Sequence, residues 1–255
     1  MALKLLILGG THEASQIAGR LANDPRFDVT LSLAGRTATP RLPPVANRFG
    51  GFGGAAGLAE YLRGQGVDVL IDATHPFAER ISANAEVAAA DAAVPLIKLA
   101  RPAWQPLAGD TWVRVPSLDA AAAALPDAPA RVFLTVGRQS LEPFAAKPQH
   151  HYLIRVIDPP VIAAAMHDVE IIEGRGPFQL AAEIALLRVH RIDWLVSKNS
   201  GGKAASAKLA AARALTLPVI LVDQPARSGM AAFTTVDAVL NELSRRHGDL
   251  TKRSV

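Results

Sequence analysis

Short aliphatic runs alternate with longer amphipathic stretches along this chain of 255 residues, and that alternation constrains the fold more than any other feature. Runs such as "KLLIL", "VTLSL", "RVFLTV" and "PVILV" have the length and composition of buried strands. The stretches between them are long enough for helices that cross from one parallel strand to the next. The sequence therefore predicts an α/β protein with mainly parallel sheets.

The order of these elements also predicts the domain organisation. Strands are expected over residues 4–8, 28–34, 67–72 and 95–99, with helices over 12–23, 55–64 and 76–90, and the second half repeats this architecture. The segment "PDAPA", residues 126–130, contains two prolines that cannot continue a helix, which is typical of a linker. We therefore expect two domains, residues 1–128 and 129–255. The polar tail "SRRHGDLTKRSV" is expected to be frayed.

Composition excludes several classes of function. The chain has no cysteine, which rules out disulfides, thiolate metal sites and cysteine nucleophiles. No nucleophile elbow and no pair of histidines at metal-binding spacing is present, so hydrolase and metal sites are not expected. The formal charge of +4 comes from scattered basic residues, which is unlike a nucleic-acid reader but compatible with an acidic small molecule. No apolar run has the length of a spanning helix, so we expect a cytoplasmic protein that binds no membrane.

The stretch "LILGGTHEA" places Gly9 and Gly10 where a predicted strand ends and a helix begins. In an open parallel sheet, ligands bind at the carboxyl ends of the strands, and the N-terminus of the following helix favours a phosphate. The stretch lacks the G-x-G-x-x-G fingerprint, however, and Thr11 with Glu13 also suits a simple helix cap. A phosphate site and a bare turn are both open from these residues alone.

The end of the second predicted strand, "TLSLAGRT", helps to choose between these alternatives. NAD-binding sites place a carboxylate about 20 residues beyond the glycines to hold the ribose hydroxyls. Here the chain offers Ser32, Arg36 and Thr37 instead, which suits the 2′-phosphate of NADPH. A solvated loop arginine is the alternative. Together with the glycine turn, this composition favours NADPH over NADH.

The segment "IDATHPF" places Asp72, Thr74 and His75 at the end of the third long strand, on the same sheet edge as Gly9. Histidine titrates near neutral pH, so His75 is a candidate proton donor or hydrogen-bond anchor for a substrate. The alternative is that His75 only caps the helix that Pro76 opens.

Two loops of the second half have a similar arrangement of strand, glycine and helix. "LTVGRQS" places Arg138, Gln139 and Ser140 at a strand end, and "VSKNSGG" does the same for Lys198, Asn199, Ser200, Gly201 and Gly202. The second loop does not fit G-x-x-x-x-G-K-[ST], so hydrolysis of nucleoside triphosphates is not expected. Ordinary polar loops are the alternative, but several such loops at strand ends favour one shared cleft between the domains.

Two further arginines are candidate ligands for a substrate carboxylate. Arg155 lies in "IRVIDPP" and Arg175 in "EGRGPF", and the planar guanidinium of each can bind a carboxylate with two hydrogen bonds. A structural ion pair with a neighbouring acid is the alternative for each.

Six segments in the same order resemble the precorrin-6A reductase family of cobalamin biosynthesis: "ILGGTHEA", "DATHPFAERISANA", "RPAW", "LTVGRQ", "IRVIDPP" and "LVSKNSGG". The resemblance runs over nearly the whole chain. It implies two Rossmann-like halves with a cleft between them, the N-terminal half binding NADPH. It also implies NADPH-dependent reduction of one double bond of the precorrin-6A macrocycle, which gives precorrin-6B.

The resemblance also assigns residues to the site. It matches the first nucleotide loop to Gly9, Gly10, Thr11 and Glu13, the adenosine end to Ser32, Gly35 and Arg36, the central motif to Asp72, Thr74, His75 and Pro76, and the loops facing cofactor and tetrapyrrole to Gly137, Arg138, Gln139, Lys198, Asn199, Ser200 and Gly201. Precorrins carry many carboxylates, for which Arg138, Arg155 and Arg175 are the expected ligands. The proton of the reduction is expected from His75, Lys198 or water.

Three other functions are compatible with parts of this pattern. Cobalt-precorrin-6A reductases of the anaerobic route share the motifs, and a non-catalytic tetrapyrrole carrier would share the fold. A generic dehydrogenase or epimerase would show Tyr-x-x-x-Lys, which neither Tyr61 nor Tyr152 begins. We expect a monomer that makes transient contacts with neighbouring pathway enzymes.

Overall fold

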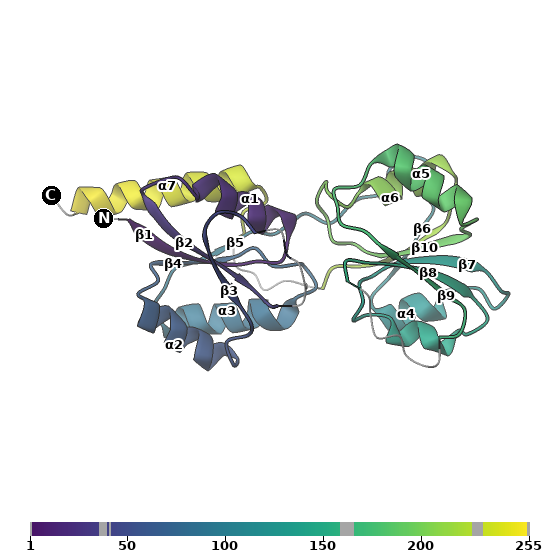
Figure 1. Ribbon diagram of the computed structural model, residues 1–255, viewed down its shortest axis with the longest axis horizontal. Helices are drawn as coiled ribbons and strands as arrows, with labels where there is room; N and C mark the ends of the chain where they lie inside the picture. Colours follow the sequence, from purple (N-terminus) through teal and green to yellow (C-terminus); the bar gives the residue numbers. More distant parts are fainter. Residues whose placement is uncertain (1, 36–39, 41, 159–165, 226–231, 254–255) are drawn as a thin grey trace. The chain divides into compact units, whose positions relative to one another are not determined.

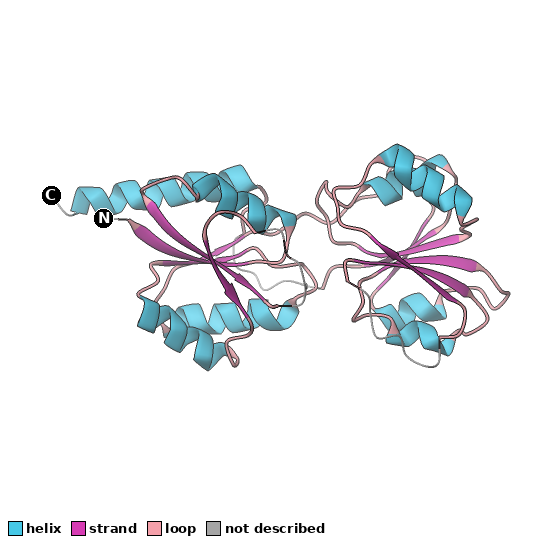
Figure 2. Cartoon of the chain, in the orientation of Figure 1, coloured by secondary structure: helices cyan, strands magenta, loops and turns pink. Residues whose placement is uncertain are grey.

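The computed structural model describes residues 2–35, 40, 42–158, 166–225 and 232–253. The chain forms two compact units, one made of Met1–Arg101 with Ala226–Val255 and the other of Pro102–Pro225. In each unit the strands form a central sheet with helices on both faces (Figure 2). The predicted α/β class with mainly parallel sheets is confirmed. In the part of the chain described, no helix combines the length and apolar composition needed to cross a bilayer.

The first unit contains a parallel sheet in the order β3-β2-β1-β4-β5, covered by α1 and α7 on one face and by α2 and α3 on the other (Figure 1). Between β1 and β4 the strand order reverses, which is where open α/β sheets bind ligands. Its elements are β1 (Leu3–Leu8), α1 (His12–Leu21), β2 (Phe27–Leu33), β3 (Ala46–Phe49), α2 (Ala55–Gln65), β4 (Val69–Asp72), α3 (Glu79–Asp91), β5 (Leu96–Lys98) and α7 (Val236–Arg253).

Strand β1 shows why the strands of this sheet can be predicted from the sequence. Leu5 and Ile7 pack into the core beneath α1 and α7, whereas Leu6 and Leu8 pack against α2 and α3 on the other face. Successive side chains of a strand point to opposite faces, so a strand covered on both faces is aliphatic at every position. The result is an uninterrupted apolar run that ends at Gly9.

The second unit contains a six-stranded parallel sheet in the order β6-β11-β10-β7-β8-β9. Helices α5 and α6 cover one face, and α4 lies on the other (Figure 1). Here the strand order reverses between β7 and β10. Its elements are β6 (Trp112–Val115), α4 (Leu118–Ala123), β7 (Arg131–Thr135), the 3-10 helix η1 (Glu142–Ala146), β8 (His151–Val156), β9 (Val169–Glu173), α5 (Leu180–Val189), β10 (Trp194–Lys198), α6 (Ala207–Ala214) and β11 (Val219–Val222).

The predicted domain boundary between residues 128 and 129 is wrong. Strand β6 pairs with β11, which places residues 112–123 in the second unit, and "PDAPA" only joins α4 to β7 within that unit. After β11 the chain returns to the first unit, where Phe233 forms a parallel bridge with Leu99. A short strand can pair with a partner a hundred residues away, and local sequence does not specify that partner.

Two further elements differ from the sequence prediction. Strand β3 was not expected, because "ANRF" is a partly polar edge strand without an apolar run. Residues 244–253 of the polar tail form the last turns of α7 instead of fraying. Val239 and Leu243 of this helix are buried against the first sheet, and Arg245 pairs with Glu242 at i,i+3 and with Asp249 at i,i+4.

Candidate functional site

Thr11 brings together the two loops at the point where strand order reverses in the first sheet. It is the N-cap of α1, and its Oγ1 accepts a hydrogen bond from the Ala14 amide at 3.1 Å. The same hydroxyl donates to the Ala73 carbonyl, just after β4, at 2.7 Å. The loop after β1 and the loop that carries His75 are therefore held side by side, as the sequence predicts for residues at one sheet edge.

The two glycines of the first loop meet different requirements. A Cβ on Gly9 would lie 2.7 Å from Leu31 Cδ1, so any other residue here would force the buried Leu31 side chain of β2 to shift. Gly10 has φ +102°, a conformation that side chains rarely adopt. The turn is shorter than the dinucleotide fingerprint but leads directly into a capped helix, whose first-turn N–H groups favour a phosphate. These features fit the pyrophosphate of a nicotinamide dinucleotide.

Glu13, in the first turn of α1, pairs with Arg101. Arg101 Nη1 lies 3.1 Å from Glu13 Oε2, and the two side chains are 13% and 16% exposed. The carboxylate thus ties α1 to the segment after β5, at the same edge of the sheet. Sequence reasoning noted the "RPAW" motif but gave Arg101 no role, since nothing local indicates its partner.

An arginine that the sequence did not single out lies beside the end of β2, on the neighbouring strand β3. Arg48 of β3 donates to the carbonyls of Gly50 and Gly51, each at 2.7 Å, and its guanidinium lies 3.7 Å from the Phe52 ring centroid. Its Nη1 is also 3.4 Å from Ser32 Oγ. Ser32 therefore lies near a cation in the region where the sequence predicts the adenosine end of the cofactor. Gly35 adopts φ +71° in the following turn. Arg36 and Thr37 lie outside the described residues.

Asp72 is almost fully buried at the end of β4 and orders its own loop. Its Oδ1 accepts from the Thr74 amide at 3.1 Å and from Thr74 Oγ1 at 2.7 Å, while Oδ2 accepts from Ser82 Oγ at 2.5 Å. The carboxylate thereby fixes the loop that carries His75 and leads into α3. Direct contact of Asp72 or Thr74 with a cofactor stays a prediction.

His75 is held in a tight turn. Its Nδ1 accepts from the Phe77 amide at 3.2 Å, and its carbonyl accepts from the Ala78 amide at 2.8 Å. Because Nδ1 is the acceptor, the neutral ring carries its proton on Nε2. Helix α3 begins only at Glu79, and its N-cap residue Ala78 makes no side-chain capping bond, so His75 orders the turn before the helix and does not cap it as the sequence alternative proposed. The same tautomer leaves Nε2–H as a hydrogen-bond donor for a ligand.

In the second unit, the loops after β7 and β10 also meet. Lys198 Nζ, at the end of β10, donates to Ser140 Oγ at 2.6 Å, and the Ser140 amide donates to the Gly137 carbonyl at 3.1 Å. Gly137 has φ +88°. Burial lowers the pKa of Lys198, which makes its ammonium a better proton donor. Arg138 and Gln139 belong to this turn, with Gln139 exposed.

Asn199 differs from its predicted role as a cofactor ligand. Its Oδ1 accepts from the Trp104 amide at 2.7 Å and its Nδ2 donates to the Trp104 carbonyl at 3.1 Å, with the residue 1% exposed. Trp104 Nε1 in turn donates to the Gly202 carbonyl at 3.0 Å. The side chain of Asn199 therefore attaches "RPAW" to the loop. Sequence reasoning quoted both motifs but could not show that they bind each other.

The rest of this loop is a compact turn. Ser200 is buried and its amide donates to the Lys198 carbonyl at 2.8 Å, while Gly201 and Gly202 have φ +61° and +79°. Two successive positive φ angles require glycine in practice.

Arg155 does not have the exposed position that a substrate ligand requires. Its Nη1 and Nη2 donate to the two carboxylate oxygens of Glu183 at 3.0 and 2.7 Å, and both side chains are nearly fully buried. The guanidinium also stacks on Phe133 and Phe178. The structural ion pair, which the sequence left open, replaces the predicted carboxylate site, because this guanidinium is already satisfied within the protein. Arg175 is half-buried between β9 and α5, and its predicted role stays a prediction.

Comparison with known proteins identifies the family. Residues 4–244 match the family described as precorrin-6x reductase CbiJ/CobK. The chain belongs to this family. A precorrin-6A reductase from Rhodobacter capsulatus is 50% identical over 241 residues, covering 94% of this chain and 96% of that protein. A solved structure of CobK precorrin-6A reductase superposes with a TM-score of 0.92 at 49% identity, covering 96% of this chain and 97% of the other.

More distant relatives carry a different description. A cobalt-precorrin-6A reductase from Priestia megaterium is 27% identical over 257 residues, covering 94% of this chain and 97% of that protein. Membership of the family establishes that the chain is an oxidoreductase of cobalamin biosynthesis with a Rossmann-like α/β fold.

Proposed function

We propose that this protein reduces precorrin-6A to precorrin-6B with NADPH. The observation that carries the proposal is the 50% identity, over nearly the full length of both chains, with a precorrin-6A reductase. The cobalt-precorrin-6A reductase is much more distant at 27% identity, which favours the metal-free substrate.

The first unit has the features expected of the cofactor site. Gly9, Gly10 and Thr11 would receive the pyrophosphate at the N-terminus of α1, and Glu13 would order that turn through Arg101. Ser32 and Gly35, with Arg36 and Thr37 from the sequence, would hold the 2′-phosphate. NADPH, when bound, would supply the hydride to one carbon of the double bond. The protein would then supply orientation and a proton for the adjacent carbon.

The second unit offers cations and donors for the carboxylates of a precorrin. Arg138, Arg175 and Lys198 are the charged candidates, with Gly137, Gln139, Ser200 and Gly201 supplying backbone and side-chain donors. For the proton, Lys198 has a pKa lowered by burial, and His75 would have to be protonated to donate from Nε2, since its Nδ1 contacts the Phe77 amide. Transfer of that proton balances the reaction, since hydride and proton together add two hydrogen atoms across the bond.

The test is turnover of precorrin-6A by the purified protein. With NADPH present, we expect loss of nicotinamide absorbance and a product heavier by two hydrogen atoms in mass spectrometry. Cobalt-precorrin-6A is assayed in parallel, and faster turnover of that substrate would overturn the choice of the metal-free one. Binding of precorrin-6A without oxidation of NADPH would instead identify a carrier.

Cofactor preference has its own test. Arg36→Ala should weaken NADPH binding by roughly 1–3 kcal/mol while changing NADH binding little, because only NADPH has the 2′-phosphate. Arg26→Ala is the matched control, since Arg26 precedes β2 at the opposite edge of the sheet and pairs with Asp24. Equal weakening of both cofactors by Arg36→Ala would contradict the assignment.

A cytoplasmic location, a monomeric state and transient contacts with pathway enzymes stay predictions.

A further inference from the structure

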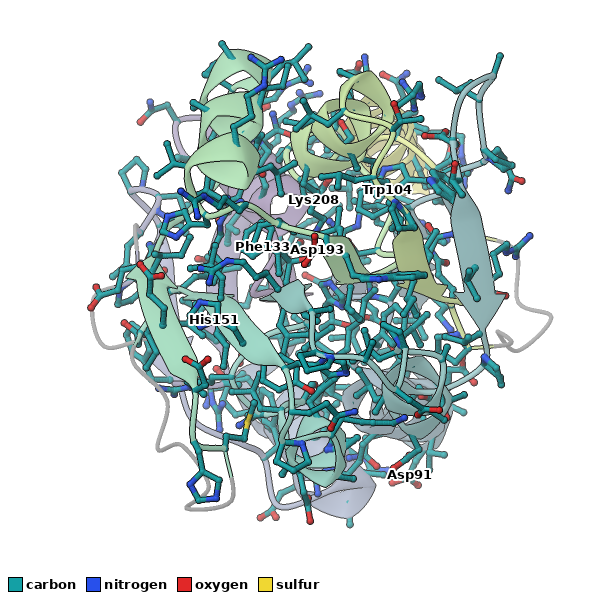
Figure 3. All side chains as sticks on the ribbon, turned by 90° about the vertical axis from the view of Figure 1, so that its right-hand side faces the viewer. Asp91, Trp104, Phe133, His151, Asp193 and Lys208 are labelled. Atoms are coloured by element: carbon teal, nitrogen blue, oxygen red, sulfur yellow. The ribbon has the colours of Figure 1, made fainter. Side chains whose placement is uncertain are left out.

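A buried lysine lies next to the loop after β10, and no role in the proposed reaction accounts for it. Lys208 is in the first turn of α6 and is 7% exposed. Its Nζ lies 5.7 Å from the ring centroid of Trp104, within range of a cation–π interaction. Figure 3 labels Lys208, Trp104 and Phe133 in this region of the second unit.

The charged neighbours of Lys208 come from two other elements. Arg155 of β8 and Glu183 of α5 form their buried ion pair close enough to act on the lysine electrostatically. Burial, reinforced by the Arg155 charge and opposed by Glu183, lowers the pKa of Lys208 to about 7. A second buried cation beside Arg155 destabilises the fold, and an apolar side chain of similar length would avoid that cost.

The contact of Lys208 with Trp104 reaches the predicted ligand loop. The Trp104 indole donates to the Gly202 carbonyl, and both polar groups of the Trp104 backbone bind the Asn199 amide. Trp104 is thus attached to both ends of the turn Asn199–Gly202, and its ring faces the Lys208 ammonium. Lys198, which contacts Ser140, immediately precedes this turn.

We propose that Lys208 is a positioning residue: its ammonium, stacked on Trp104, holds the turn Asn199–Gly202 in the shape that receives a carboxylate-bearing ligand. This inference rests on the proposed function for the identity of the ligand, a precorrin. According to this inference, the positive charge of Lys208 is required for substrate affinity. The same buried charge lowers the stability of the folded protein. Lys208 acts through Trp104 and does not itself contact substrate.

The first measurement needs no substrate. All three tryptophans, Trp104, Trp112 and Trp194, lie in the second unit, so tryptophan fluorescence during urea unfolding reports on that unit. We expect Lys208→Met to raise the urea midpoint at pH 7, because it removes a buried charge. The wild-type protein should gain stability from about pH 7 toward pH 10, since the unfolded chain then binds the proton that folded Lys208 has lost. Lys208→Met should lack that gain.

The second measurement is steady-state kinetics with precorrin-6A. We expect Lys208→Met to raise KM about tenfold with kcat within about twofold, because one cation–π contact organises the turn. Because Lys208 loses its charge near pH 7, we expect the wild-type KM to rise above that pH. Lys208→Arg, which keeps a cation at every pH, should restore KM to within about threefold of wild type and should lack that rise. Lys147→Met is the control, since Lys147 pairs with Asp127 near the opposite edge of the same sheet.

The two measurements separate failure of this inference from failure of the proposed function. A Lys208→Met protein that is less stable than wild type, or that keeps a wild-type KM, overturns the positioning role. If the wild-type protein turns over no precorrin-6A, the proposed function fails. Independently of that result, a urea midpoint of Lys208→Met below that of wild type would overturn the inference about Lys208. Greater stability together with a raised KM, restored by Lys208→Arg, supports it.

Discussion

Removal of Glu183 should destabilise the second unit more than any other single change to its charged residues that we consider. Its carboxylate accepts from both terminal nitrogens of Arg155 at 2.7 and 3.0 Å, and the two side chains are 3% and 8% exposed. Glu183→Leu would leave the Arg155 cation buried between Phe133 and Phe178 without its anion. Breaking a buried pair in this way costs about 3–5 kcal/mol.

The assay is urea unfolding followed by tryptophan fluorescence, which reports on the second unit. With a urea dependence of about 2 kcal/mol per molar, the midpoint should fall by about 1.5–2.5 M. The double variant Arg155→Met/Glu183→Leu should recover to within about 1 kcal/mol of wild type, because it removes both charges together. Asp127→Ala, which breaks the exposed pair with Lys147, should leave the midpoint unchanged.

Two results would refute this reasoning. A loss below about 1 kcal/mol in Glu183→Leu would mean that water reaches the Arg155 guanidinium and screens its charge. A double variant as unstable as Glu183→Leu alone would mean that lost packing, and not the unpaired cation, causes the destabilisation.

Three further predictions address the first loop, the candidate proton donor and acid stability. Gly9→Ala should lower the unfolding free energy by about 1–3 kcal/mol and raise KM for NADPH, because its Cβ would lie 2.7 Å from Leu31 Cδ1; unchanged values for both would mean that the turn is looser than described. His75→Ala should lower kcat by about 100-fold or more with little effect on NADPH binding if His75 donates the proton, and an unchanged kcat would leave it as a residue that only orders the turn before α3. Burial, followed by the Lys147 charge, lowers the pKa of His150, so its contribution to stability is complete above about pH 6.5 and is lost as the pH falls. His150→Gln should therefore reduce the loss of urea stability between pH 7 and pH 5, and an identical loss in both proteins would contradict that assignment.

The strands of both sheets were predictable because most of them are covered on both faces. Leu5 to Leu8 are all buried, and such a run is visible without knowledge of its partners. The edge strand β3 was missed for the same reason, since "ANRF" is only partly buried. The domain boundary was misplaced because prolines at residues 126 and 129 indicate where a helix stops, but not with which strand β6 pairs.

The position of the loops was likewise predictable, but the partners of their side chains were not. Parallel strands carry their carboxyl ends at one edge, which is why Gly9 and His75, or Ser140 and Lys198, were expected to lie near each other. Asn199 and Arg155 have the chemistry of ligand-binding groups, yet the fold supplies Trp104 and Glu183 as their partners. Chemical type alone does not distinguish a group facing a ligand from one that is satisfied internally.

By itself, the sequence determined the α/β class, the strand-end loops and the resemblance to a family of reductases, because these depend on local apolar runs and on short motifs. Only the tertiary structure decided which polar groups are already paired, where each unit begins and ends, and that Lys208 is buried beside Trp104 and Arg155. These properties depend on contacts between residues far apart in the chain. The pKa of Lys208 and the loss of stability expected when Glu183 is removed both depend on burial and on nearby charges. These conditions arise only when residues far apart in the sequence come together in the fold.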